Sequence, residues 1–363
     1  MAYYVGLDVS QKSTAICVID DKGAKVVEGA ALSRPGDIYG WLANRVEVGD
    51  IAKVGLEAST LSSWLHTQLS QHGLPMLCLE AFQAHRFLAT QRNKTDKNDA
   101  RGLAQLVRMG GEDFLKLVVV RSQVNQEIRA LLAMRQHLVR QKVDLENHIS
   151  GILKPFGLIV ERGDVCAATF RDRVVEALCL AEDREVRIRS TVMPPLDLYR
   201  SACEHLAGLT RQVETIAKQD RICRRLMTVP GVGAVIALSF MSAVDYPERF
   251  KRSADVAAYF GLTPRQFQSG QVDYQTGISK RGDPMVRTHL VTAATVLLTS
   301  SKRWCPLKAW GVKLAQRQGM RKASVAVARK LAIVMHRMWL ERKDFRYESA
   351  HKAPQEELTA MTA

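Results

Sequence analysis

Four carboxylates lie within the first hundred residues where they could share metal ions: Asp8, Glu57, Asp96 and Asp99. Asp8 and Glu57 each end an apolar run that should be buried, and a buried carboxylate is costly unless it is paired or bound to a metal. Asp96 and Asp99 are three residues apart, which places them on one face of a helix. Each residue taken singly would also suit a strand-end turn or a helix cap. Together they favour two divalent cations, which need many oxygen ligands and promote in-line phosphoryl displacement.

The segments that carry these carboxylates predict an α/β domain over residues 1–120. Apolar runs predict strands at 3–7, 13–20, 25–31, 54–57 and 76–79, and helical periodicity predicts helices at 35–46, 61–72 and 96–108. Three strands, a helix, a strand, a helix and a strand follow the order of a ribonuclease-H-like sheet. Such a sheet would bring the four carboxylates together.

A long helical region, 121–222, is expected to follow this domain. A helix is predicted over 123–153, because leucine or isoleucine recurs every seven residues at Leu131, Leu138, Leu145 and Ile152. A second periodic run carries Leu206, Leu209, Val213 and Ile216. The two runs could pair as an antiparallel coiled coil within one chain, or they could pair between subunits. Arg135 and Lys142 interrupt the first seam.

A third, mainly α-helical domain is predicted over residues 223–345, and residues 346–363 are expected to be a disordered tail. The string from Leu226 to Leu238 contains Pro230, Gly231 and Gly233 and resembles a helix-hairpin-helix turn, in which backbone amides approach a phosphate. An ordinary Gly-Pro turn between helices fits the same string equally well. A polar, turn-rich stretch to Gly282 and helices at 285–300 and 321–342 complete the domain.

The net charge of +15 is concentrated in one part of the chain. Residues 1–120 hold 13 basic and 13 acidic residues, whereas residues 251–346 hold 19 basic and 5 acidic residues, a net charge of +14. Such a segment is expected to meet a polyanion, although a solvated face that aids solubility would also be basic. Aromatic residues make up only 6% of the chain, and no motif distinguishes RNA from DNA.

Composition also excludes several classes of protein. The 7 cysteines include no Cys-x-x-Cys pair, which argues against a disulfide framework or a zinc site. No apolar run is long enough for a membrane span, and the first residues predict a strand rather than a signal peptide. We therefore expect a cytoplasmic protein without a membrane partner.

The motifs around the carboxylates resemble a known family. Gly-Leu-Asp8-Val-Ser-Gln-Lys, Leu-Glu57-Ala-Ser-Thr and Lys94-Thr-Asp96-Lys-Asn-Asp99-Ala together look like the DEDD quartet of a RuvC-like domain. The variant is similar to bacterial insertion-sequence transposases of family one-ten, the bridge-RNA-guided recombinases. Strings beginning at Met227, Tyr259 and Gly277 match the same family, so the resemblance spans roughly residues 3 to 340.

This resemblance implies a DNA transposase with a serine nucleophile, which corresponds here to Ser269. Ser269 would attack a DNA phosphodiester, with Mg²⁺ or Mn²⁺ at the DEDD site as the activator. Nearby Arg265, Lys280, Arg281 and Arg287 could hold phosphates; Ser279 and Ser242 are weaker candidates for the nucleophile. The resemblance further implies a structured guide RNA, and exchange of two strands requires a homo-oligomer, a dimer or a tetramer.

Three other functions fit part of the pattern. A RuvC-like junction nuclease that uses water as nucleophile explains the carboxylates and the basic segment, but gives the C-terminal domain no role. An actin-like or sugar-kinase ATPase would share the first loop around Asp8, but no second Asp-x-Gly-Thr loop follows. A non-catalytic helix-hairpin-helix binding protein would not need Asp8 or Glu57.

Overall fold

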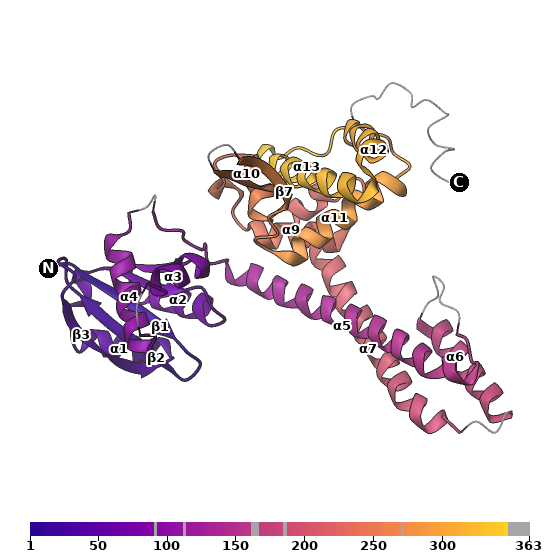
Figure 1. Ribbon diagram of the computed structural model, residues 1–363, viewed down its shortest axis with the longest axis horizontal. Helices are drawn as coiled ribbons and strands as arrows, with labels where there is room; N and C mark the ends of the chain where they lie inside the picture. The colour runs from indigo at the N-terminus through magenta and orange to yellow at the C-terminus, as the bar shows by residue number, and fades with distance from the viewer. Residues whose placement is uncertain (91–92, 112–113, 161–166, 184–186, 270–271, 348–363) are drawn as a thin grey trace. The chain divides into compact units, whose positions relative to one another are not determined.

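The computed structural model describes residues 1–90, 93–111, 114–160, 167–183, 187–269 and 272–347. Gly270, Cys166 and most of the expected tail (348–363) lie outside these ranges. The chain divides into two compact units, Met1–Arg121 and Ser122–Ala363, shown by colour in Figure 1. In the described part of the chain, no helix is both long and apolar enough to cross a membrane.

The first unit contains a five-stranded sheet in the order β3-β2-β1-β4-β5. Its strands are β1 (Tyr3–Val9), β2 (Ser13–Ile19), β3 (Lys25–Leu32), β4 (Ile51–Glu57) and β5 (Met76–Leu79). The first three strands form an antiparallel meander, and β1, β4 and β5 run parallel to one another. The expected mixed α/β sheet at the N-terminus is confirmed.

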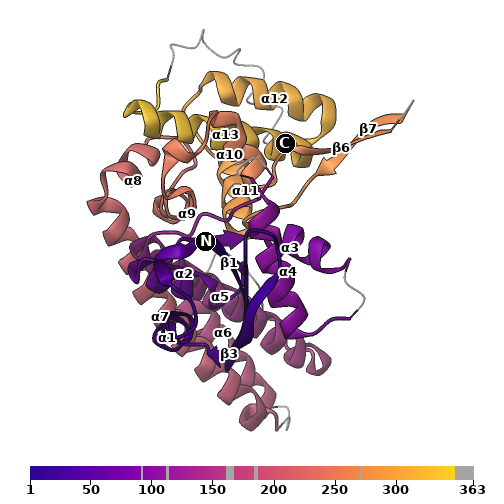
Figure 2. The ribbon, with the colours of Figure 1, turned by 90° about the vertical axis from the view of Figure 1, so that its left-hand side faces the viewer.

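Helices cover both faces of this sheet (Figure 2). Side chains alternate between the faces of a strand; Val5 and Leu7 of β1 therefore pack in one core with helices α1 (Pro35–Ala43) and α2 (Ser62–Gln71). The opposite face packs against α3 (Ala81–Leu88) and α4 (Asp96–Met109). Helix α3 is absent from the sequence prediction, because its eight residues are too few for a clear period.

The second unit begins with two long helices, α5 (Gln123–Leu153) and α7 (Arg189–Gln219), which pack along each other within the chain. The short α6 (Ala167–Asp183) shares a core with one end of this pair. At the other end, Ile128 and Val213 belong to the same core as the C-terminal helices. The long helices are therefore continuous with the C-terminal core.

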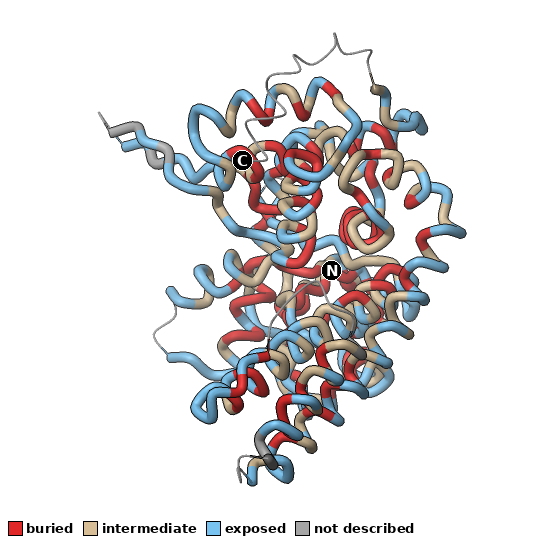
Figure 3. Tube along the Cα trace, turned by 90° about the vertical axis from the view of Figure 1, so that its right-hand side faces the viewer, coloured by how far each residue is buried: buried red, intermediate tan, exposed pale blue. Residues whose placement is uncertain are grey.

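The C-terminal part of this unit packs six helices around one buried core, whose residues are among those coloured red in Figure 3. These helices are α8 (Arg221–Leu226), α9 (Ala234–Val244), α10 (Ser253–Tyr259), α11 (Pro284–Thr299), α12 (Pro306–Gln318) and α13 (Met320–Glu341). The turn between α8 and α9 packs closely on α11: Gly231 has a positive φ of 84°, and a Cβ there would lie 2.5 Å from the Ala293 carbonyl oxygen.

The polar stretch before Gly282 is an antiparallel hairpin rather than a succession of turns. Strands β6 (Pro264–Ser269) and β7 (Val272–Ile278) pair, with Ser269 opposite Val272. The prediction of turns missed this hairpin because Phe267 is the only large apolar residue of β6, whereas Val272, Tyr274 and Ile278 do alternate with other residues along β7. Pairing of the two strands forms the hairpin.

Candidate active site

Asp8 and Glu57 lie side by side at one edge of the sheet. Leu7 of β1 pairs with Leu56 of the parallel strand β4, and the two carboxylates follow directly in their strands. Because side chains alternate, Asp8 and Glu57 lie on the face opposite to Leu7 and Leu56, which are fully buried in the core against α1 and α2. That opposite face is the one that α4 covers.

Helix α4 crosses β1 so closely that only glycine fits at the crossing. A Cβ on Gly6 would lie 2.0 Å from the Ala100 carbonyl oxygen and 2.4 Å from the Ala104 nitrogen. Asp8 is two residues beyond Gly6 on the same face, and Asp99 directly precedes Ala100. The crossing therefore brings the start of α4 to the carboxyl ends of β1 and β4.

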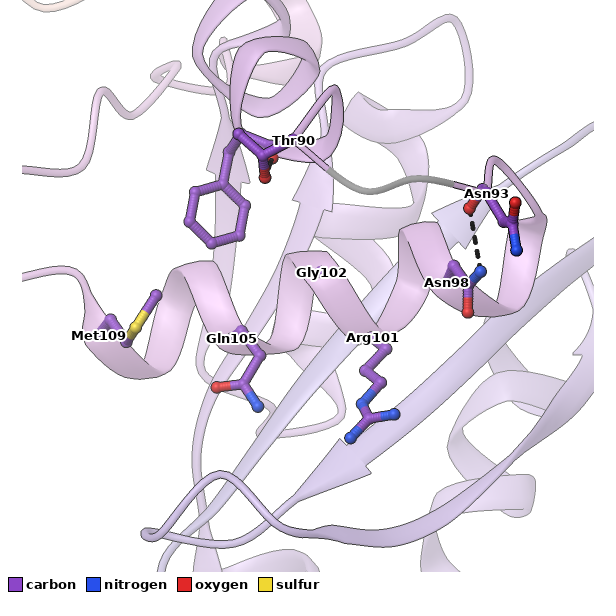
Figure 4. A pocket seen from close by; sticks show the side chains of 8 residues that line it. Thr90, Asn93, Asn98, Arg101, Gly102, Gln105 and Met109 are labelled. Carbon is purple, nitrogen blue, oxygen red and sulfur yellow. Dashed lines mark hydrogen bonds between the residues drawn. The ribbon is translucent and has the colours of Figure 1, made fainter.

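The start of α4 is held in place by several hydrogen bonds. The Thr95 hydroxyl accepts from the Asn98 amide nitrogen at 3.2 Å, so the helix begins at Asp96, with Asp96 and Asp99 in its first turn. The Asn98 side chain donates to the Asn93 carbonyl oxygen at 2.9 Å, as Figure 4 shows. One turn from the other end, Gln105 donates to the Gly23 carbonyl oxygen at 2.8 Å.

The residues drawn in Figure 4 line a hollow of about 520 Å³ along α4, with Asn98, Arg101 and Gln105 on the helix. Asp96 and Asp99 do not line this hollow. The polar side chains of the hollow thus fasten α4 to the preceding loop and to the β2–β3 turn. They position the helix that carries two of the four carboxylates.

The electrostatics of Asp8 reflect how close the carboxylates are. The pKa of Asp8 is raised to about 6, chiefly by burial and also by the negative charges of Asp96, Asp99 and Glu57. Burial also raises the pKa of Glu57, with a contribution from Asp99. The structure therefore gathers all four predicted residues into one cluster of mutually repelling groups.

In the described part of the chain, this repulsion is not offset by an ion pair. Among the described residues, none of the four carboxylates forms an ion pair, although Asp99 is only 8% exposed. Carboxylate oxygens are the hard donors that Mg²⁺ and Mn²⁺ prefer. The side chains do not form a coordination shell in this structure: among the described residues, no three Asp, Glu, His or Cys side chains surround one metal position. The donor set fits divalent cations in chemistry and number.

Two residues near the cluster were missed by the sequence analysis as site residues. The positive charge of Lys94 lowers the pKa of both Asp8 and Glu57, and that of His85 lowers the pKa of Glu57. Lys94 lies two residues before Asp96 in the same motif, so the sequence could have identified it as a cation near the carboxylates. His85 lies on α3, a helix that the sequence did not predict, and carried no signal.

Replacing Gly6 by Ala should separate α4 from the sheet. We expect a loss of about 2 to 4 kcal/mol in the free energy of unfolding, as for overpacked sites, because the new methyl would overlap backbone atoms that cannot move alone. Urea denaturation measures this loss. Gly40→Ala is the matched control: Gly40 lies within α1 with open space around it, so Ala should be neutral or stabilise by up to about 1 kcal/mol. Equal stabilities for the two variants would contradict the close crossing.

Ser269 lies in the second unit, exposed, as the last residue of β6. Figure 2 shows the hairpin projecting from the helices of this unit. Arg265 is at the other end of the same strand, about 13 Å away for four extended residues, and Lys280 and Arg281 follow the end of β7. The described structure therefore places these basic residues at the base of the hairpin and not around the serine hydroxyl.

The arginines at the hairpin base also hold the backbone together. Arg265 donates to the Ser279 carbonyl oxygen at 3.0 Å, and Arg287 donates to the Phe260 carbonyl oxygen at 3.1 Å. Gly282 has a positive φ of 85°, and a Cβ there would lie 1.9 Å from the Tyr259 carbonyl oxygen. The two chain segments at the base are therefore in close contact.

The two alternative serines differ in accessibility. Ser242 is fully buried in α9, and its hydroxyl donates to the Ser239 carbonyl oxygen at 3.3 Å, so a DNA strand cannot reach it in this structure. Ser279 is partly exposed and follows β7 at the hairpin base.

Comparison with known proteins defines the class of this chain. Residues 5–157, which include all four carboxylates, match a transposase family named for its DEDD residues, and residues 223–307 match the family described as "Transposase IS116/IS110/IS902 family". The N-terminal fold is therefore that of a DEDD transposase domain. The transposase for insertion sequence element IS1111A of Coxiella burnetii is 30% identical over 353 residues, which are 94% of this chain and 91% of that protein. The chain belongs to the IS110 family of transposases, an enzyme class that recombines DNA and whose DEDD domain uses divalent metal.

Other relatives extend the similarity. A probable family 20 transposase of Pseudomonas aeruginosa is 28% identical over 67% of this chain and 72% of its own length. A pilin gene-inverting protein of Moraxella bovis is 24% identical over 70% of this chain and 68% of its own length.

Proposed function

We propose that this transposase cuts and exchanges the DNA strands of an insertion sequence through a covalent serine–DNA intermediate. The observation that carries the proposal is the cluster of Asp8, Glu57, Asp96 and Asp99, four oxygen-bearing side chains that converge without an ion pair among the described residues. Burial and mutual repulsion make such a cluster costly unless it serves to bind cations. The meander followed by two parallel strands supports a RuvC-like domain.

In this proposal the four carboxylates hold Mg²⁺, or Mn²⁺, which stabilises negative charge on the phosphate under attack when it is bound. The backbone positions of β1, β4 and α4 orient the carboxylates before DNA arrives. The Thr95 cap and the Gly6 crossing keep Asp96 and Asp99 beside Asp8. The role of β1, β4 and α4 is to hold the carboxylates in fixed positions, because phosphoryl transfer depends on positioning and on electrostatic stabilisation.

Ser269 supplies the nucleophile. Its Oγ forms a bond to phosphorus, the bond from phosphorus to one deoxyribose oxygen breaks, and that oxygen leaves as a free hydroxyl with the proton that the serine gives up. The phosphoserine ester conserves the bond energy, so another strand's hydroxyl can reverse the step and reseal DNA without ATP. An exposed position at the end of β6 gives the hydroxyl access to a backbone phosphate. A free serine is a weak nucleophile, and a divalent cation held by the four carboxylates would supply the activation that it needs.

The partners follow from the same scheme. Exchange of two strands needs at least two subunits, and the paired helices α5 and α7 expose apolar side chains such as Met134 and Leu198, which are 54% and 63% exposed. We propose that these helices contribute to a homo-oligomer. By resemblance to its family, a structured non-coding RNA chooses the DNA sites. The proposed domains are 1–120 (DEDD), 121–222 (helical) and 223–345 (serine-bearing).

A RuvC-like junction nuclease that uses water as nucleophile is the second candidate, favoured by the carboxylate cluster alone. The experiment that separates the two mixes the full chain with guide RNA, Mg²⁺ and end-labelled DNA carrying the element's end, and then denatures the protein. Labelled DNA that migrates with the protein until protease treatment supports the serine intermediate. Nicked DNA with free phosphate ends and no protein-linked species supports the nuclease.

A further inference from the structure

A groove of about 650 Å³ lies between the base of the hairpin and helix α13. Leu262 and Ile278 from the hairpin base and Val325 from α13 give it an apolar lining. Its cationic side chains are Arg321, Lys322 and Arg329, all exposed and all on α13. None of these three was among the predicted nucleic-acid contacts.

The cations of this groove are uncompensated. Residues 284–340 contain eleven Lys and Arg residues and no Asp or Glu residue. Within the described residues, Arg321, Lys322 and Arg329 form no ion pair. Three exposed cations beside an apolar lining, within a stretch that contains no acidic residue from 284 to 340, match the charge of a polyanionic backbone and the apolar surface of its sugars.

The spacing of the cations also suits a nucleic-acid strand. Lys322 and Arg329 are seven residues apart, which puts them on one face of α13 about 10 Å apart along the axis. Measured along the axis of a duplex, which rises about 3.4 Å per base pair, that separation corresponds to about three base pairs. The groove can therefore hold more than one phosphate of the same strand.

We propose that this groove binds the backbone of the DNA that Ser269 attacks, an inference that rests on the proposed function. Pro264 and the Thr276–Ile278 segment, which line the groove, belong to the two strands of the hairpin that carries Ser269. From Pro264 to Ser269 the extended strand spans about 17 Å, which is the axial length of about five base pairs of a duplex. DNA held in the groove thus lies within reach of the serine.

The test compares full-length variants of equal net charge in binding a fluorescein-labelled DNA duplex of mixed sequence at several salt concentrations. The groove variant is Arg321→Gln/Lys322→Gln/Arg329→Gln, and the control is Arg211→Gln/Lys251→Gln/Lys302→Gln, three exposed cations outside the groove. Each lost phosphate contact lowers the slope of log affinity against log salt by about 0.9. We expect the groove variant to lose about 2 to 3 in slope, with binding at least about tenfold weaker, and the control to lose less than about 1.

Further variants and probes decide the remaining outcomes. Arg321→Lys/Arg329→Lys retains the charge and should keep the slope of the parent. Equal losses in the groove and control variants, or tighter binding of an RNA duplex of the same sequence with an unchanged DNA slope, would overturn the proposal. Protein–DNA adducts of the wild-type protein test the serine mechanism separately from the groove. If wild-type protein forms none, the serine mechanism fails whatever the salt slopes show.

Discussion

Asp8→Asn should abolish strand transfer and at the same time stabilise the metal-free protein. Activity should fall by on the order of 10²- to 10³-fold or more, because a neutral amide is a poor ligand and the metal would lose a charged oxygen. Stability should rise because Asp8 is half-buried among Asp96, Asp99 and Glu57, with its pKa raised to about 6. Solvent screening limits the gain at neutral pH to about 1 to 2 kcal/mol.

The pH dependence of this gain has a definite sign. A carboxyl whose pKa is raised from 3.8 to about 6 binds its proton more tightly in the folded state than in the unfolded state. Its contribution to stability is fully present below pH 3.8 and is lost as the pH rises through about 6. In the presence of a chelator, the advantage of Asp8→Asn over wild type should therefore be absent at pH 4 and reach its full size at pH 7.

Urea denaturation with and without Mg²⁺ measures both effects. Saturating Mg²⁺ should stabilise wild type, by about 2.7 kcal/mol at a hundred times its dissociation constant, and should stabilise Asp8→Asn much less. Asp21→Asn, an exposed carboxylate in the β2–β3 turn, is the matched control and should change neither stability nor activity. An Asp8→Asn protein that recombines DNA as well as wild type would refute the catalytic role of the cluster.

Ser269→Ala should eliminate the covalent protein–DNA species while leaving DNA binding intact. We expect strand transfer to fall by at least about 10⁴-fold, since no other atom at that position can form the ester. The side chain is exposed, so its replacement should change stability by less than about 0.5 kcal/mol. Denaturing gels of end-labelled DNA measure the adduct, and fluorescence anisotropy measures binding.

Ser279→Ala is the control for this variant, because Ser279 lies at the opposite end of the same hairpin and was the accessible alternative. It should form adducts at the wild-type rate. Adducts that persist in Ser269→Ala and disappear in Ser279→Ala would move the nucleophile to the hairpin base. Adducts in neither variant, or in both, would exclude the assignment of a single serine at position 269.

Much of the fold followed from local patterns. Apolar runs placed β2, β3 and β5 within one residue of their observed bounds, and the seven-residue leucine repeat placed α5 at Gln123–Leu153. Two elements were not predicted. Helix α3 is only two turns long, and β6 has a single large apolar residue, so the alternation along its partner β7 was not recognised as half of a hairpin.

The sequence by itself identified the four acidic candidates and the basic C-terminal segment, because these depend only on residue type. It also indicated an α/β domain at the N-terminus and a mainly α-helical domain at the C-terminus, because these depend on short-range apolar patterns. The tertiary structure alone decided the distances. The close passage of α4 over Gly6 brings Asp96 and Asp99 to Asp8, although 88 residues separate Asp8 from Asp96. The hairpin likewise decided the distance between Arg265 and Ser269, because an extended strand places these two residues near its opposite ends. Packing between segments distant in sequence sets such distances, and no local pattern encodes it.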